Sequence, residues 1–270
     1  MKKIVLIAVV FFNICQVLAQ TDSVNSFDEK KFFENLKTSY YSLQATDTKN
    51  ITVLLTNIST EEFAMREWKN PEIFPLQLMW LSPDRLFLSQ QGAPTLSDSS
   101  QKVYTDLVNS LKSQITDILF DLKRFYFSDI YNFISEDYEV INKKDVVKVT
   151  FNSVVNTDTT YFQYFFGLNG LCLKILSFTP SQNLTVEVNP SFKTSKTKWI
   201  IAGWEVKMHR NNEISTGYFA ELKFKEKENI WFPSEIILTV QRKTELGKTF
   251  NEVLKFRNLL LNQSLQYIDQ

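Results

Sequence analysis

Residues 161–178 read YFQYFFGLNGLCLKILSF, and this stretch decides the fold. Two apolar runs, Tyr161–Phe166 and Leu171–Phe178, flank the sequence Gly167-Leu168-Asn169-Gly170. An Asn-Gly pair between apolar runs is a strong short-range signal for a β-hairpin. Successive side chains of a strand point to opposite faces, so the first run places aromatic rings on both faces. The run Tyr161–Phe166 therefore predicts either a core strand that is covered on both sides or a strand that lines an apolar cavity.

Alternation of apolar and polar residues continues on both sides of this hairpin, from Tyr138 almost to the end of the chain. In the segment 199–209 every second residue is apolar: Ile200, Ala202, Trp204, Val206 and Met208. In the segment 218–225 one face carries Tyr218, Ala220, Leu222 and Phe224, and the other carries Glu221, Lys223 and Lys225. Such alternation over consecutive, closely spaced strands is typical of an antiparallel sheet with one face in water.

Upstream of Tyr138 the pattern is mixed. β-branched residues between Asn50 and Thr60 favour a strand. The residues 74–90 indicate two strands around a turn at 82–85. Helical spacing of apolar residues predicts a helix over 27–44, a short helix that begins near Ser59 and ends before Pro71, a long helix over 100–124 and a shorter one over 129–134.

These elements predict an α+β fold. We expect a large, curved antiparallel sheet, in effect an incomplete β-barrel, with a few helices that cover its apolar concave face. The helices over 27–44 and 100–124 are the candidates for this cover, because both have an apolar stripe and the strands supply the rest of the chain.

The first nineteen residues of the chain resemble a secretory signal peptide. Lys2 and Lys3 precede an apolar run over 4–12, and Ala19 offers a small residue before a cleavage site at Gln20. The predicted organisation is therefore a signal peptide over 1–19 and a single domain over 20–270. The run over 4–12 is too short to span a bilayer, so we expect an exported protein, periplasmic or extracellular, that is not an integral membrane protein after signal removal.

Composition excludes several classes of function. The chain has 30 Lys+Arg and 30 Asp+Glu, which argues against nucleic-acid binding because that usually needs a basic surface. One His and two Cys exclude paired-Cys zinc sites and HExxH metalloproteases, so we expect no metal and no cofactor. The sequence does not indicate an oligomeric state.

We identify no catalytic residues and expect that the protein is not an enzyme. The single histidine, His209, alternates with charged residues and is interpreted as a surface residue. Cys172 is interpreted as a packed free thiol rather than a nucleophile. A hydrolase built on two carboxylates remains the enzymatic alternative, although Glu61/Glu62, Glu136/Asp137 and Glu226/Glu228 are each interpreted as solvated charges.

The functional prediction rests on the aromatic hairpin over residues 161–178. A curved sheet that its helices cover incompletely leaves a concave apolar site for an acyl chain or another hydrophobe. The candidates for the lining of such a cavity are Leu78, Trp80, Tyr161, Tyr164, Phe165, Trp204 and Phe224.

Three short motifs resemble the LolA/LolB-like superfamily of periplasmic lipoprotein carriers. They are Phe32-Phe33-Glu34-Asn35-Leu36 in the first helix, the Trp- and Pro-containing hairpin over 79–88, and Trp231-Phe232-Pro233-Ser234-Glu235-Ile236 near the end. The resemblance covers most of residues 27–261 as an order of elements. It implies an unclosed antiparallel β-barrel with helices as a lid over an apolar cavity.

Two functions follow as expectations. The first is an exported, non-enzymatic binding protein for a hydrophobic ligand (a lipid, an acyl chain or a lipoprotein), of which a periplasmic carrier is one form. The alternative is a structural or protein-interaction module of the cell envelope, with a filled core and no small ligand.

Overall fold

The computed structural model describes residues 27–264, apart from 156, 196, 211–212 and 243–248. The predicted signal peptide lies outside the described residues. The helices are α2 (Glu29–Ser39), α3 (Ile58–Trp68), α4 (Asp98–Leu122), the π-helical turn η1 (Lys123–Phe127), and the 3-10 turns η2 (Ile130–Phe133) and η3 (Pro180–Gln182). The strands are β1 (Asn50–Asn57), β2 (Leu76–Leu81), β3 (Arg85–Gln90), β4 (Tyr138–Lys143), β5 (Val146–Val155), β6 (Asp158–Gly167), β7 (Cys172–Thr179), β8 (Leu184–Ser195), β9 (Lys198–Arg210), β10 (Glu213–Lys227), β11 (Ile230–Arg242) and β12 (Thr249–Leu261).

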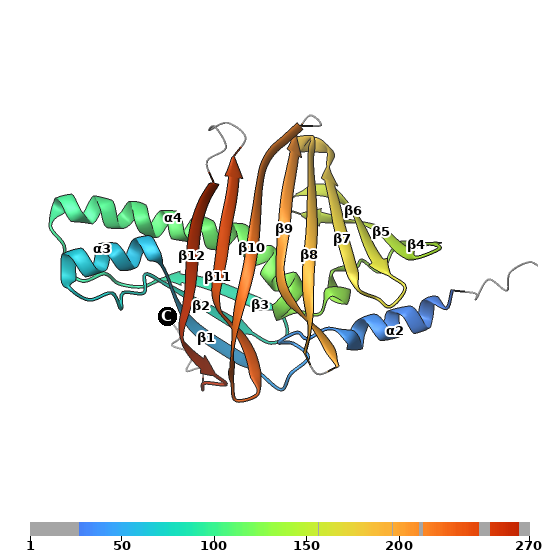
Figure 1. Cartoon of the computed structure of the whole chain (residues 1–270), viewed down its shortest axis with the longest axis horizontal. Helices are drawn as coiled ribbons and strands as arrows, with labels where there is room; N and C mark the ends of the chain where they lie inside the picture. The colour runs from blue at the N-terminus through green and yellow to red at the C-terminus, as the bar shows by residue number, and fades with distance from the viewer. Residues whose placement is uncertain (1–26, 156, 196, 211–212, 243–248, 265–270) are drawn as a thin grey trace, which may run out of the picture.

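The strands of the described chain form one sheet of twelve, with the order β3-β2-β1-β12-β11-β10-β9-β8-β7-β6-β5-β4. All of its strand pairs are antiparallel. From β4 to β12 the chain is a continuous meander, and β12 then pairs with β1. The sheet does not close, because β3 and β4 are its two edges. The predicted α+β fold with a large, unclosed antiparallel sheet is confirmed (Figure 1).

The first helix is shorter than predicted. It starts after Asp28, whose side chain accepts a hydrogen bond from the Lys31 amide at 3.0 Å, and it ends at Ser39 rather than at residue 44. The chain then leaves the helix and turns at residues 44–45, and the Leu43 amide donates to the Tyr126 carbonyl at 2.7 Å. Leu43 is fully buried, as its apolar spacing indicated, but tertiary packing rather than a helix buries it.

The long helix α4 starts at Asp98, capped by Ser97, and passes behind β12 to β9 in the view of Figure 1. Without a break it continues into η1, where Phe125, Tyr126 and Phe127 are all buried. Phe125 packs against Trp204 with ring centroids 6.1 Å apart, and Phe127 stacks on Trp80 at 6.3 Å. This turn therefore fills the middle of the inner face of the sheet.

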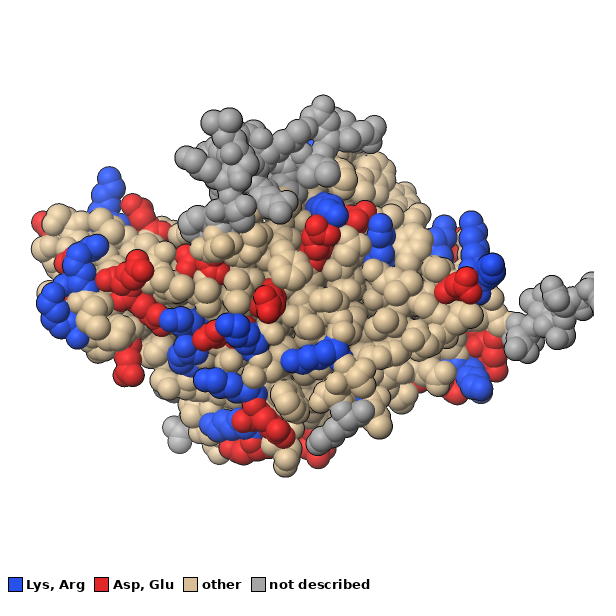
Figure 2. Space-filling model, in the orientation of Figure 1, with Lys and Arg blue, Asp and Glu red and all other residues tan. Residues whose placement is uncertain are grey.

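The outer face of the sheet carries the charged residues that alternation predicted. Figure 2 shows Lys and Arg side chains intermixed with Asp and Glu over this side of the molecule. Cross-strand ion pairs are part of the pattern, for example Lys174 with Glu187 at 3.3 Å between β7 and β8. Intermixed charges give this face no extended field of one sign.

Candidate functional site

A pocket of about 600 Å³ lies at the β5–β6 end of the inner face. Its walls come from the end of α4, from η2 and the two residues that follow it, and from β5 and β6. The lining residues are Phe120, Asn132, Phe133, Ile134, Ser135, Phe151, Ser153, Val154, Val155, Phe162 and Tyr164. A volume of this size falls within the range of small-molecule sites, about 300–1,000 Å³.

Strand alternation explains one wall of this pocket. Phe162 and Tyr164 are separated by one residue on β6, so both point inward, and both meet Phe151 from the neighbouring strand β5. The ring centroid of Phe151 lies 5.2 Å from that of Phe162 and 5.2 Å from that of Tyr164. The three rings make one continuous aromatic surface.

The opposite wall comes from helical segments. The ring of Phe120, near the end of α4, packs edge-on against Phe133 with centroids 6.0 Å apart. Phe120 remains 47% exposed, so this side of the pocket opens to solvent. The lining contains no charged side chain; its polar members are Asn132, Ser135, Ser153 and Tyr164. Such a lining favours an apolar ligand with few hydrogen-bonding groups.

A buried charged group stands directly behind this lining. The guanidinium of Arg124, in η1, pairs with Asp121 and donates to the Tyr164 hydroxyl at 3.3 Å. It also lies 4.9 Å from the ring centroid of Phe120 and 5.9 Å from that of Tyr164, within cation–π range. The Tyr218 hydroxyl donates to the second carboxylate oxygen of Asp121 at 3.2 Å.

The protonation states of this group follow from its burial. Burial opposes the charged form of Arg124, but Tyr164 and Asp121 outweigh it and raise the pKa of the guanidinium above its usual value. Desolvation also raises the pKa of the Tyr164 phenol, against the opposing effect of Arg124. The pKa of Tyr218 is raised by desolvation and then by Asp121. Arg124 is therefore charged and both tyrosines are neutral across the physiological range.

The predicted cavity residues divide into four groups, of which three lie on the inner side of the sheet. Tyr164 alone lines the pocket. Leu78, Trp80 and Trp204 are fully buried on the inner face, where η1 covers the two indoles. Phe224 is partly buried, with its ring 6.0 Å from that of Tyr126. The middle of the concave face is thus packed with side chains, and the pocket lies at one end of it.

Tyr161 and Phe165 lie on the other face of the sheet from Tyr164. Tyr161 is 50% exposed and pairs with Phe178 across β6 and β7, whereas Phe165 is half-buried. The two-residue period of a strand separates odd from even positions, so Tyr161 and Phe165 could not share a lining with Tyr164. The same two-residue period would have identified Phe162 from the sequence as a lining residue. No local sequence pattern would have identified Phe120 or Phe133 as lining residues.

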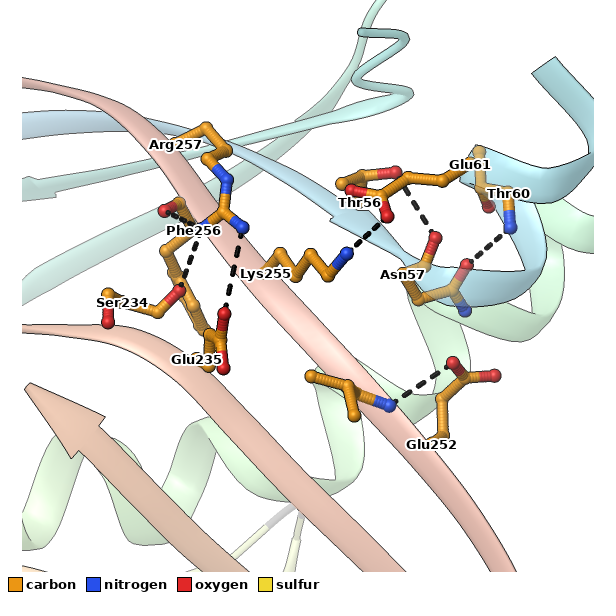
Figure 3. Close-up of polar contacts among 11 residues, drawn as sticks. Thr56, Asn57, Thr60, Glu61, Ser234, Glu235, Glu252, Lys255, Phe256 and Arg257 are labelled. Carbon is orange, nitrogen blue, oxygen red and sulfur yellow. Dashed lines mark hydrogen bonds and ion pairs between the residues drawn. The ribbon is translucent and has the colours of Figure 1, made fainter. Parts of the chain in front are cut away.

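A second polar cluster joins α3 to β11 and β12, as Figure 3 shows. Lys255 pairs with Glu61, and Arg257 lies 3.7 Å from a carboxylate oxygen of Glu235. The buried carboxylate of Glu252 accepts from the Ser59 hydroxyl at 3.1 Å. The Lys255–Glu61 and Ser59–Glu252 contacts tie α3 to β12, whereas the Arg257–Glu235 contact joins β12 to β11.

Cys172 is buried, and its amide donates to the Tyr40 hydroxyl at 2.6 Å. Burial raises the pKa of its thiol to about 12, because the charged thiolate is disfavoured away from water. At neutral pH the thiol is therefore protonated and weakly nucleophilic.

Two features are absent from the part of the chain that the structure describes. There, no three His, Cys, Asp or Glu side chains gather closely enough to hold a metal ion. The described helices also include none that is both long and apolar enough to cross a membrane.

Comparisons with protein-family models, with curated proteins and with solved structures find no match to this chain. None of the three comparisons supports the resemblance to the LolA/LolB-like carriers, which rests on the short sequence motifs alone. What the structure shows is the large antiparallel sheet and three α-helices of the described residues.

Proposed function

We propose that this protein is an exported, non-enzymatic binding protein for a hydrophobic ligand such as a lipid or an acyl chain. The observation that carries the proposal is the pocket of about 600 Å³, with its aromatic and aliphatic lining, at the open end of the inner face. The signal-peptide pattern over 1–19 supports export. The resemblance to lipoprotein carriers adds support for an acyl ligand in particular.

A second candidate is a protein-interaction module of the cell envelope. Two observations favour it: η1 fills the middle of the concave face, and apolar side chains are exposed on the outer face. Tyr161 and Phe178 face each other there and are 50% and 41% exposed. Exposed apolar pairs of this kind occur at contact surfaces, although scattered ones are also normal.

Blocking the pocket separates the two candidates. Ser153 lines the pocket from β5, so Ser153→Trp places an indole in the space where a ligand would lie. We expect this variant to lose most of the uptake of the uncharged fluorescent probe N-phenyl-1-naphthylamine, an apparent affinity loss of at least about tenfold. The measurement is a fluorescence titration of residues 20–270.

The matched control is Asn152→Trp, one residue earlier on the same strand. Asn152 is exposed and pairs with Tyr161 on the outer face, so its indole adds apolar area without entering the pocket. We expect uptake close to that of the unmodified protein. If the unmodified protein takes up no probe, or if both variants lose it equally, the ligand-binding proposal is wrong and the interaction module becomes the better explanation.

A further inference from the structure

The last four residues of β5 form an open strand edge inside the sheet. β6 pairs with β5 as far as Val155, which faces Asp158, whereas β4 pairs with β5 only as far as Phe151, which faces Tyr138. Within the described part of the chain, residues 152–155 therefore have a neighbouring strand on one side only. An uncovered strand edge is a template for pairing with another chain.

This edge presents backbone groups to solvent. Val155 and Asp158 form the closing pair of the β5–β6 hairpin, so their backbone groups face each other. Alternate residues of a strand direct their N–H and C=O groups to opposite neighbours, so those of Val154 point away from β6, toward the side that β4 leaves open. Val154 is 69% exposed, and Asn152 and Ser153 are exposed as well, so a partner can reach this edge.

The pocket of about 600 Å³ lies directly beside this edge. Ser153, Val154 and Val155 belong to its lining, together with residues 133–135, which precede β4 in the chain. No lining residue comes from β3 or β4, the two outermost strands of the described sheet. Side chains of an added strand alternate between the two faces, so one of them can enter the pocket while the backbone pairs with Val154.

The chain around this edge is acidic. Residues 129–142 and 149–173 contain the edge and most of the pocket lining, and they include five Asp or Glu and no Lys, Arg or His. Exposed Glu136 and Asp137 come just before β4 begins, and Asp158 pairs with the last residue of the edge. Carboxylates therefore stand at both ends of the edge.

Two basic groups from the helical segments lie against these residues, and they do not cancel the negative charge. Lys37 lies over the ring of Tyr131, 4.2 Å from its centroid, but Glu29 offsets it and accepts from the Tyr138 hydroxyl at 3.2 Å. The charge of Arg124 is balanced by its buried ion pair. The excess of negative charge favours a positively charged partner over a negatively charged one.

We propose that the open edge of β5 is a docking site for an extended, basic peptide segment of another protein. The segment pairs as a strand with residues 152–155, places one apolar side chain in the pocket, and carries Lys or Arg residues that face the carboxylates. In this mode of recognition, main-chain hydrogen bonds give affinity and the pocket gives specificity. The docking site goes beyond the proposed function and does not depend on the uptake of a small hydrophobic ligand.

The test uses three rhodamine-labelled peptides and residues 20–270. The first peptide is Lys-Val-Thr-Phe-Thr-Val-Lys, the second has Glu in place of both Lys, and the third has N-methyl groups on its Thr and Phe residues. The measurement is fluorescence anisotropy at low ionic strength, where exposed charges are least screened. We expect the second and third peptides to bind at least about tenfold more weakly than the first, through like-charge repulsion and lost backbone hydrogen bonds.

Val154→Pro tests the edge itself. Proline removes the N–H that points away from β6, and it is tolerated at a strand edge where that N–H faces solvent, so the fold should be kept. We expect this variant to bind the Lys peptide at least about tenfold more weakly. The matched control is Val154→Thr, which keeps the N–H and the β-branched shape, and its affinity should stay within about threefold. Circular dichroism checks the folding of both variants.

Three results overturn the inference: no binding of the Lys peptide up to about 1 mM, equal binding of the three peptides, or equal binding by the two Val154 variants. A dimer of the chain in sedimentation that Val154→Pro dissociates also overturns it, because a second copy then occupies the edge. Uptake of N-phenyl-1-naphthylamine is measured in parallel. Uptake without peptide binding leaves the proposed function standing, whereas peptide binding without uptake supports the docking site and overturns the proposed function.

Discussion

Buried side chains that carry a charge or a reactive sulfur have the largest effects of any single residues on the stability and reactivity of this protein. The side chain of Arg124 is almost completely buried, so its charge depends on Asp121 and on the hydroxyl of Tyr164. Breaking a buried pair by removing one partner is strongly destabilising, because the other charge stays buried and unpaired. The stability of η1 thus depends on this buried guanidinium and its carboxylate partner.

Arg124→Met tests this dependence. We expect a loss of about 3–5 kcal/mol in the free energy of unfolding, measured by urea denaturation, because Asp121 is left without its cation. The control is the preceding residue: Lys123 pairs with Asp84 at 3.2 Å and is 31% exposed. Lys123→Met should cost no more than about 1 kcal/mol. Equal losses for the two variants would show that burial does not govern the strength of the Arg124 pair.

The thiol of Cys172 predicts a pH dependence. Its pKa is about 12 in the folded protein against an ordinary value of 9.0, so between these values the unfolded chain loses a proton that the folded chain keeps. Stability from this group is complete below pH 9 and falls as the pH rises above it. In the folded protein at pH 8 we expect alkylation by iodoacetamide to be slower by at least about a hundredfold than in concentrated urea, because only the thiolate reacts.

A thiol one position further along the chain provides the comparison. Leu173 is 44% exposed, so in the double variant Cys172→Ser/Leu173→Cys the sulfur is accessible to solvent. That thiol should react at a similar rate in the folded and the unfolded protein. Fast alkylation of Cys172 in the native state would contradict both its burial and its raised pKa.

Among the elements, the strands could be predicted well from the sequence and the helical segments less well. The alternation in β9 and β10 is a local property, and it assigned the inward positions of Trp204 and Ala220 correctly. The first helix was predicted too long because Leu43 continues the helical spacing, although Tyr126 rather than a helical turn satisfies its amide. The π-helical turn η1 has no sequence pattern of its own; contacts with distant strands select it.

The close packing of β9 against β10 gives a prediction at this scale. A Cβ at Gly203 would lie 2.4 Å from the Ala220 carbonyl oxygen on the neighbouring strand, so the backbone of the pair would have to shift. We expect Gly203→Ala to lower the free energy of unfolding by about 1–3 kcal/mol, the usual cost of overpacking.

Gly92→Ala is the control for this substitution, because a Cβ there meets no atom within 4 Å. Its effect should stay within about 0.5 kcal/mol. Urea denaturation of both variants is the measurement. If Gly203→Ala and Gly92→Ala change the free energy of unfolding equally, the close approach of β9 and β10 at Gly203 does not affect stability.

At the scale of the whole molecule, the sequence indicated the antiparallel sheet but neither its strand order nor the position of its pocket. The pairing of β1 with β12 joins segments from opposite ends of the chain, and no local pattern specifies it. The pocket wall made by Phe120 and Phe133 depends on where α4 ends over the sheet, which is again a long-range property. Tyr164 could be predicted because it lies on an alternating strand whose inward face is continuous with the core.

The pairing of β1 with β12 also determines the order in which the protein can fold. A chain emerges from the ribosome with its N-terminal end first, so β1, β2 and β3 exist long before their neighbour β12 is made. Contacts between distant segments form slowly, and until then β1 exposes an unpaired edge. The sheet therefore cannot be completed during synthesis. Until its last strand is available, a nascent chain of this topology has two separate sets of strands, β1 to β3 and the meander that starts at β4, and only β12 can join them into one sheet.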